Sequence, residues 1–107
     1  MFALNDDITK DQLDEKVSRK ILGYGGHLML VEVSFKKGGV GAIHAHPHEQ
    51  VSYIAKGSFE VTNGPEKKVL KQGDSFYVPG GVKHGTVALE DAIIVDSFTP
   101  LREDFLK

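Results

Sequence analysis

Cysteine is absent from this 107-residue chain, and the chain also lacks a basic excess and a long apolar run. Without cysteine there are no disulfides, thiolate metal ligands or cysteine nucleophiles. A formal net charge of -2 gives no basic surface for nucleic acid, so we expect no nucleic-acid partner. Residues 1–7 lack the cationic and apolar parts of a secretion signal, and no later stretch is long enough to span a bilayer. We therefore expect a cytoplasmic protein with no membrane partner.

The size and composition of the chain are those of one globular domain, to which we assign residues 1–107. Its 12 glycines fall between short apolar or alternating runs, as turns fall between strands. The runs rich in Val, Ile, Phe and Tyr predict strands at Leu28–Phe35, Gln50–Ala55, Ser58–Thr62, Ser75–Val78, Gly85–Leu89 and Ala92–Phe98. Many short antiparallel strands favour an all-β barrel or sandwich.

Turn residues separate the predicted strands. We expect Asn63-Gly64-Pro65 and Lys56-Gly57 to close hairpins, and Gln72-Gly73-Asp74 to lead back into the sheet, because Gly and Asn accept positive φ angles. The only helical candidate is the polar stretch Thr9–Lys16. It has few apolar positions, so we predict a short N-terminal lead-in there.

A cluster of histidines is the strongest chemical signal in the sequence. His44, His46 and His48 alternate along the chain, and His84 follows the turn Pro79-Gly80-Gly81. Imidazoles two residues apart on an extended segment point to the same side, so they can bind one metal ion without any help from cysteine. The sequence therefore predicts a metal site built on histidine.

Strand parity also indicates which neighbours share that side. Gln50 has the same parity as the three alternating histidines, whereas Glu49 falls on the opposite face unless a bulge at Pro47 shifts the register. A helix over this segment is excluded because Pro47 would lie in its interior. His27 is isolated, and we interpret it as an ordinary structural histidine.

The spacing of these residues resembles the two sequence motifs of the cupin family. The first motif, Gly, five residues, His-x-His, three residues, a polar ligand, six residues, Gly, is matched by Gly38, His44, His46, Gln50 and Gly57. The second, Gly, five residues, Pro-x-Gly, two residues, His, is matched by Gly73, Pro79, Gly81 and His84. Ala88 stands where the family often has asparagine. Two motifs in the right order are far more specific than a lone glycine pattern.

This resemblance implies a small antiparallel jelly-roll barrel, commonly a homodimer, with one divalent metal ion held inside by His44, His46, Gln50 and His84. On that mapping His48 is not a ligand. The family usually has Glu where this chain has Gln50, so the ligand set is neutral and favours Lewis-acid chemistry over redox chemistry. Three nitrogens and one amide oxygen suit Ni, Zn, Mn or Fe, so the sequence does not select the metal.

A closer resemblance, to the small pectin-degradation cupins, lies in the flanking segments Arg19–Gly25, His44–Val51, Gly73–Pro79 and Arg102–Leu106. That family opens the ring of 4,5-unsaturated monouronates, released from pectin or alginate by lyases, to give a linear keto form. Its functional Asp, Phe and Arg, spaced Asp-x-Phe, three residues, Arg, match Asp96, Phe98 and Arg102. The resemblance makes these residues the proton carrier, the pocket wall and the carboxylate clamp.

The strand pattern agrees with those roles but leaves ordinary alternatives open. Ile94, Asp96 and Phe98 alternate onto one face of the predicted terminal strand, which could be the barrel interior. Asp96 could instead end a strand at the barrel mouth and pair with a surface cation. Arg102 could belong to a solvated charged tail, and Phe98 could be plain core.

Two functions of other classes are also compatible with the motifs. A cupin dioxygenase would use the same histidines to hold Fe(II), and it would consume oxygen in the presence of its substrate; Gln50 argues mildly against it. A non-catalytic cupin would bind or sense a sugar without turnover. We expect the metal-dependent, non-redox enzyme, because Asp96 and Arg102 favour catalysis.

Overall fold

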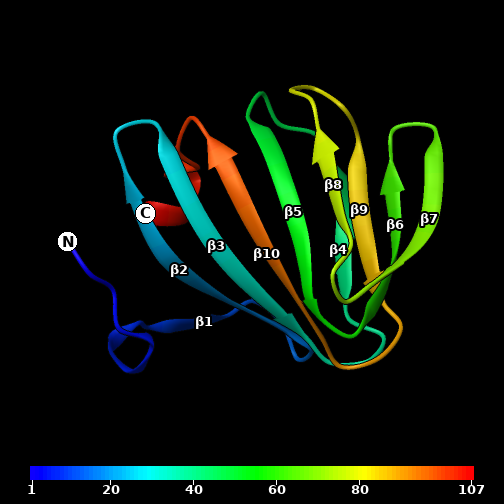
Figure 1. The fold of residues 1–107 in the computed structure, drawn as a ribbon, viewed down its shortest axis with the longest axis horizontal. Coiled ribbons are helices and arrows are strands. Elements are labelled where there is room, and N and C mark those ends of the chain that lie inside the picture. Colours follow the sequence, from blue (N-terminus) through cyan, green and yellow to red (C-terminus); the bar gives the residue numbers. More distant parts are fainter.

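The chain, described over residues 1–107 by a computed structural model, folds into two antiparallel β-sheets with both termini on the side of the larger sheet (Figure 1). The six-stranded sheet has the order β1-β2-β3-β10-β5-β8, and the four-stranded sheet has the order β4-β9-β6-β7. The strands are β1 (Lys10–Gln12), β2 (Val17–Gly25), β3 (Leu28–Phe35), β4 (Val40–His44), β5 (Glu49–Lys56), β6 (Ser58–Asn63), β7 (Glu66–Lys71), β8 (Ser75–Val78), β9 (His84–Ala88) and β10 (Ala92–Thr99). The predicted all-β jelly-roll barrel is confirmed.

The six predicted strands are all present. Two of them coincide with β3 and β8, and the other four differ from β5, β6, β9 and β10 by one residue at one or both ends. Strands β1, β2, β4 and β7 were not predicted. The stretch Thr9–Lys16, the helical candidate that we predicted to be a short lead-in, contains no helix; it contains β1, whose three residues pair with β2.

Two short 3-10 helices, η1 (Asn5–Asp7) and η2 (Glu103–Leu106), lie close to the chain ends. Neither has the length or the apolar character needed to cross a membrane. In Figure 1, η2 lies beside the end of β10 and against β2. This placement brings the last residues of the chain to the open end of the barrel.

The turns differ from the predictions at one place. Asn63-Gly64-Pro65 closes the β6–β7 hairpin, as predicted. Lys56-Gly57 does not close a hairpin, because β5 pairs with β10 and β8 while β6 belongs to the other sheet. Gly57 instead carries the chain between the sheets with φ at 71°, and a Cβ there would lie 2.5 Å from the Asp91 carbonyl oxygen. Only glycine fits this crossing.

The apolar core joins the two sheets. Phe35 of β3 packs edge-to-face on Phe59 of β6, with ring centroids 5.0 Å apart, within a buried cluster that also includes Ile54 and Ile94. Along β10 every second side chain is buried, in the sequence Ala92, Ile94, Asp96 and Phe98. The inward face of this strand therefore runs from the apolar core to a buried carboxylate, which marks where the site begins.

Candidate metal centre

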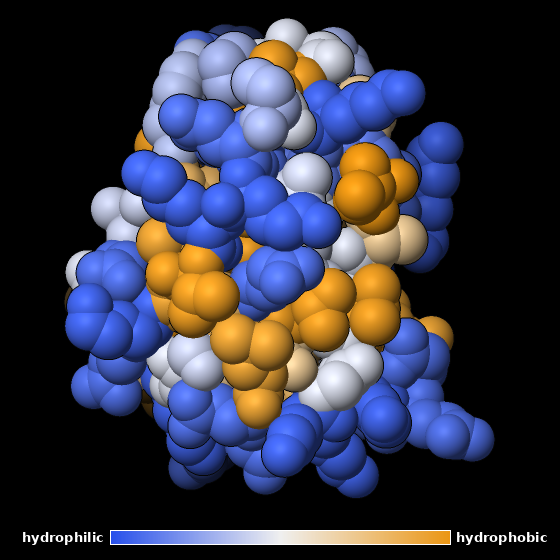
Figure 2. All heavy atoms as spheres, turned by 90° about the vertical axis from the view of Figure 1, so that its right-hand side faces the viewer, coloured by the Kyte–Doolittle hydropathy of each residue, from blue (hydrophilic) through white to orange (hydrophobic).

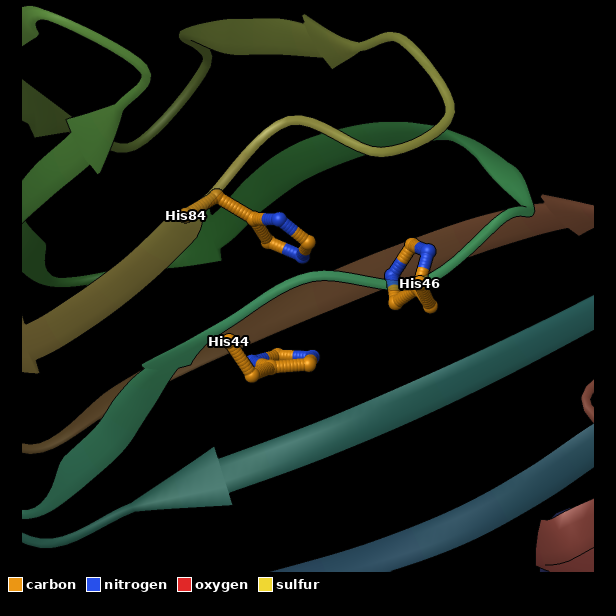
Figure 3. Close-up of side chains that lie close together, drawn as sticks. All are labelled: His44, His46 and His84. Atoms are coloured by element: carbon orange, nitrogen blue, oxygen red, sulfur yellow. The ribbon is translucent and has the colours of Figure 1, made fainter.

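Three histidines converge at the open end of the barrel (Figure 3). His44 is the last residue of β4 and His84 the first of β9, and the two are paired across the four-stranded sheet. His46 lies in the loop between β4 and β5. One ring nitrogen from each histidine can be chosen so that all three lie within 4.8 Å of one another. The structure thus brings together three side chains that the motifs single out.

The side chains of His48 and Glu49, which lie between His46 and Gln50 in the sequence, do not join the three histidines. The prediction of one continuous extended segment through residue 50 is wrong, because β4 ends at His44 and residues 45–48 form a loop. His48 uses its Nε2–H to bind the carbonyl oxygen of Leu101 at 3.0 Å. Glu49 accepts a hydrogen bond of 2.6 Å from the hydroxyl of Tyr77. Neither His48 nor Glu49 belongs to the three-histidine cluster.

Backbone carbonyl groups fix the orientation of all three rings. His44 Nδ1 lies 2.9 Å from the oxygen of Ala42, and His84 Nδ1 lies 2.9 Å from the oxygen of Val82. His46 Nδ1 makes the equivalent contact with the oxygen of His48 at 3.0 Å. A carbonyl oxygen only accepts, so each Nδ1 carries the proton and each Nε2 keeps a free lone pair.

Burial supports the same protonation state. Desolvation is the main cause that lowers the pKa of His46, and it also lowers the pKa of His84. Both imidazoles are therefore mainly neutral at neutral pH, the form in which histidine binds a metal ion.

The contacts of the free Nε2 atoms test whether these residues fit a metal ion. His84 Nε2 is buried and has no hydrogen-bond partner. His46 Nε2 lies 3.0 Å from Gln50 Oε1, although both atoms are acceptors when His46 carries its proton on Nδ1. Two acceptors at this distance repel each other unless a cation lies against both. An orphaned nitrogen and a pair of facing acceptors fit a divalent ion ligated by His44, His46, His84 and Gln50.

Gln50 connects this cluster to a buried carboxylate. Its Nε2 donates hydrogen bonds of 2.8 Å to Ser52 Oγ and 3.3 Å to Asp96 Oδ1. Ser52 Oγ donates to the same Asp96 oxygen at 2.5 Å. Because the amide nitrogen faces these acceptors, the amide oxygen must face His46. Glutamate at position 50 would place a second carboxylate beside Asp96, and the two charges would repel.

Asp96 is buried, which excludes the alternative of an acid at the barrel mouth. Desolvation raises its pKa from the ordinary value of 3.8 to about 6, against the lowering effect of the hydrogen bonds from Ser52 and Gln50. Both of those hydrogen bonds end on Oδ1. A carboxyl group with this pKa can gain and lose a proton near neutral pH.

Phe98 and Arg102 complete the set of predicted residues. Both are buried, so Arg102 is not part of a solvated tail. The Arg102 Cζ lies 5.1 Å from the centroid of Phe98, and its Nε and Nη2 donate to the carboxylate of Asp104 at 3.1 and 2.9 Å. Together with Asp96, these side chains line a cavity of about 290 Å³, which is also lined by His44, Gln50 and His84.

Two further side chains were not assigned a role from the sequence: Ser52, which is hydrogen-bonded to Asp96, and Arg19, which lines the cavity. Ser52 follows Gln50 by two residues on β5, and Arg19 lies between Val17 and Ile21 on β2. For both residues, the only signal in the sequence was the alternation of side chains along a strand, which can place a residue on the inward face. Ser52 looked like an ordinary strand residue, and β2 was not predicted at all, so no face was assigned to Arg19.

The comparisons with known proteins agree with the fold and with this geometry. Residues 31–98 match the cupin domain. The chain is 39% identical over 107 residues to the pectin degradation protein KdgF of Dickeya dadantii strain 3937, covering 98% of this chain and 97% of that protein.

Two solved structures are similar over nearly the whole chain. A cupin from Shewanella frigidimarina NCIMB 400, described as RmlC-like, is 41% identical with a TM-score of 0.94, covering 97% of this chain and 94% of that one. KdgF from Halomonas sp. is 39% identical with a TM-score of 0.93, covering 98% of this chain and 99% of that one.

Replacing His84 by alanine is expected to weaken binding of Ni²⁺ or Zn²⁺ by at least about tenfold, since even residues that only support a ligand produce losses of this size. Isothermal titration of chelator-treated protein measures the effect. His27→Ala, in the exposed turn between β2 and β3, is the matched control and should bind metal as the unaltered protein does. Unchanged metal affinity in His84→Ala would contradict the assignment.

Asp96 should make the stability of the metal-free protein depend on pH. Because its pKa is raised on folding, the folded state holds more protons than the unfolded state between about pH 4 and pH 6, and stability falls as pH rises through that range. Asp96→Asn removes this dependence, so the free energy of unfolding of the variant, relative to that of the unaltered protein, should rise by about 2 kcal/mol between pH 4 and pH 7. Urea denaturation at several pH values measures the difference, which exposed Asp91→Asn should not reproduce.

Proposed function

This chain belongs to the cupin family, and from that premise we propose that it opens the ring of 4,5-unsaturated monouronates derived from pectin. The observation that carries the proposal is a single cavity lined by two histidines of the three-histidine cluster, His44 and His84, together with the buried acid Asp96 and the buried cation Arg102. The name of the Dickeya relative supports a substrate from pectin degradation. We propose the same reaction for the epimer of this substrate that is derived from alginate. We also predict that the protein acts in the cytoplasm.

We assign the metal ion to His44, His46, Gln50 and His84. A divalent ion bound by these residues supplies Lewis-acid stabilisation of negative charge on substrate oxygens. The neutral ligands leave the charge of the ion uncompensated, which suits an anionic substrate. Ni, Zn, Mn and Fe all match this donor set.

Asp96 carries the proton through its Oδ2, the oxygen that Ser52 and Gln50 leave free. It takes the proton of the anomeric hydroxyl while a carbonyl forms at C1 and the bond from C1 to the ring oxygen breaks. The electron pair passes to the ring oxygen and gives an enolate. Asp96 then returns the proton to C4, which leaves a ketone at C5, so the reaction is an isomerisation in which no atom is gained or lost.

Arg102 and Phe98 orient the substrate. The N–H groups of Arg102 that do not bind Asp104 are available to the substrate carboxylate. Phe98 forms the wall beside this guanidinium. Together they hold the ring against the proton carrier rather than taking part in bond breaking.

Metal-loaded protein is expected to remove the ultraviolet absorbance of the conjugated double bond of unsaturated galacturonate faster than buffer does. Asp96→Asn should lower kcat by about 10²-fold or more, since the amide cannot exchange the proton. Asp91→Asn, at the far end of the same strand region, should keep full activity. No acceleration by the unaltered protein, or full activity in Asp96→Asn, would reject the proposal.

We also propose that the protein forms a homodimer through the outer face of the six-stranded sheet. The register places Leu30, Ser97, Val51 and Tyr77 in one row across β3, β10, β5 and β8, with Tyr53 in the next row. The four apolar or aromatic members of this set are each 41% to 50% exposed. A contiguous exposed apolar patch of this kind is typical of a protein interface.

The β6–β7 side of the molecule also has an apolar area, but its edge strand is charged. Seen from β6 and β7, apolar side chains gather in the middle of the surface, with hydrophilic side chains above and below them (Figure 2). The edge strand β7 carries exposed Lys67, Lys68 and Lys71, which discourage edge-to-edge contact.

Light scattering is expected to give a mass near twice the 11.7 kDa of one chain. Val51→Lys should shift the protein towards the monomer, because it places a charge in the centre of the proposed interface. Val69→Lys, on exposed β7, is the matched control and should leave the mass unchanged. A monomeric unaltered protein, or a dimeric Val51→Lys, would contradict the proposed interface.

A further inference from the structure

Arg19 is a charged residue on the inward face of β2. Its strand partner is Val33, and the flanking inward residues of β2, Val17 and Ile21, pair with Phe35 and Val31. The side chain is only 17% exposed, and it lines the same cavity as Asp96. A cation among apolar inward positions is costly unless it meets an acceptor.

The protein itself leaves part of this guanidinium without a partner. Arg19 Nε is buried and makes no hydrogen bond. The only ion pair of Arg19 is with Asp11 at 4.0 Å, which is a long contact to a half-exposed carboxylate. Asp14, another acid of the cavity lining, accepts the backbone N–H groups of Lys16 and Val17 instead. No carboxylate of the chain therefore satisfies Arg19.

Arg102 offers less to a ligand than Arg19 does. Two of the nitrogens of Arg102 already bind both oxygens of Asp104. Phe105 of η2 holds both cations in place, with the Cζ of Arg19 at 3.9 Å and that of Arg102 at 4.2 Å from its centroid. Stacking on an aromatic ring restrains Arg19 before any ligand binds, which lowers the entropy cost of recognition.

We propose that Arg19 is a second anion-recognition residue of the cavity, which binds a carboxylate oxygen of the sugar acid together with Arg102 and selects sugar acids over neutral sugars. This assignment rests on the proposed function in taking a sugar acid as the ligand. A guanidinium fork provides two N–H groups in one plane, so it matches a carboxylate in a way that the single ammonium group of lysine does not. Arg19 touches the substrate away from the reacting atoms, so it acts on binding more than on the chemical step.

The test compares Arg19→Met and Arg19→Lys with Lys20→Met. Lys20 is the neighbouring cation and bonds to Asn5 Oδ1 instead of lining the cavity, so it is the matched control. Isothermal titration of metal-loaded protein with galacturonate, which lacks the reactive double bond, should show a Kd at least about tenfold higher for Arg19→Met and a smaller increase for Arg19→Lys. Galactose should bind all variants with the affinity it has for the unaltered protein. With unsaturated galacturonate, KM should rise while kcat changes little.

The proposal is overturned if Arg19→Met, or the charge-retaining Arg19→Lys where the first does not fold, binds galacturonate as tightly as the unaltered protein. It is also overturned if galactose binding falls by the same factor, because that is a structural effect, or if the unaltered protein does not bind galacturonate. Arg19-dependent binding of galacturonate without any ring opening would keep the recognition role and reject the proposed function. Ring opening by Arg19→Met with an unchanged KM would keep the proposed function and reject the recognition role of Arg19.

Discussion

Hydrogen bonds from imidazole Nδ1–H to backbone carbonyl oxygens two residues away are the interaction on which the site depends. They fix the rings of His44, His46 and His84, so that the Nε2 lone pairs remain for one ion. The carbonyl groups belong to the chain beside each histidine, so the ends of β4 and β9 and the loop before β5 set both the position and the tautomer of each ring. The site is therefore determined by main-chain geometry as much as by the histidines.

Gln50 connects the three-histidine cluster with the buried carboxylate of Asp96. One end of its amide faces His46, and the other end donates to Ser52 and Asp96. A carboxylate ligand would offer only acceptors in this place, and the buried acid beside it would then be pushed towards its neutral form. The amide allows a buried carboxylate with a pKa of about 6 to lie next to the ligand set. The presence of Gln50, where cupins usually have glutamate, is thus explained by the buried carboxylate of Asp96 beside it.

The sequence predicted the parts of the fold that carry strong periodic or motif signals. β3 and β8 were predicted to the residue because both are apolar runs between turns, whereas β7 was missed because its Lys-rich sequence faces solvent at a sheet edge. The motif spacing identified the three histidines of the cluster. Strand parity wrongly placed His48 on the same side as His44 and His46, because the chain leaves the strand after His44. Ser52 and Arg19 could not be identified because their importance comes from neighbours distant in sequence, namely Asp96 and Phe105.

The strand that bears Asp96 is the last one in the chain, yet it lies between β3 and β5 in the middle of the larger sheet. During synthesis on the ribosome, β3 and β5 therefore each have one edge without its hydrogen-bonded neighbour until residues 92–99 emerge and pair with both strands. A nascent chain that stops short of this strand has neither a closed barrel nor the acid of the site. Closure of the barrel and the placement of Asp96 beside Ser52 and Gln50 are consequently one event.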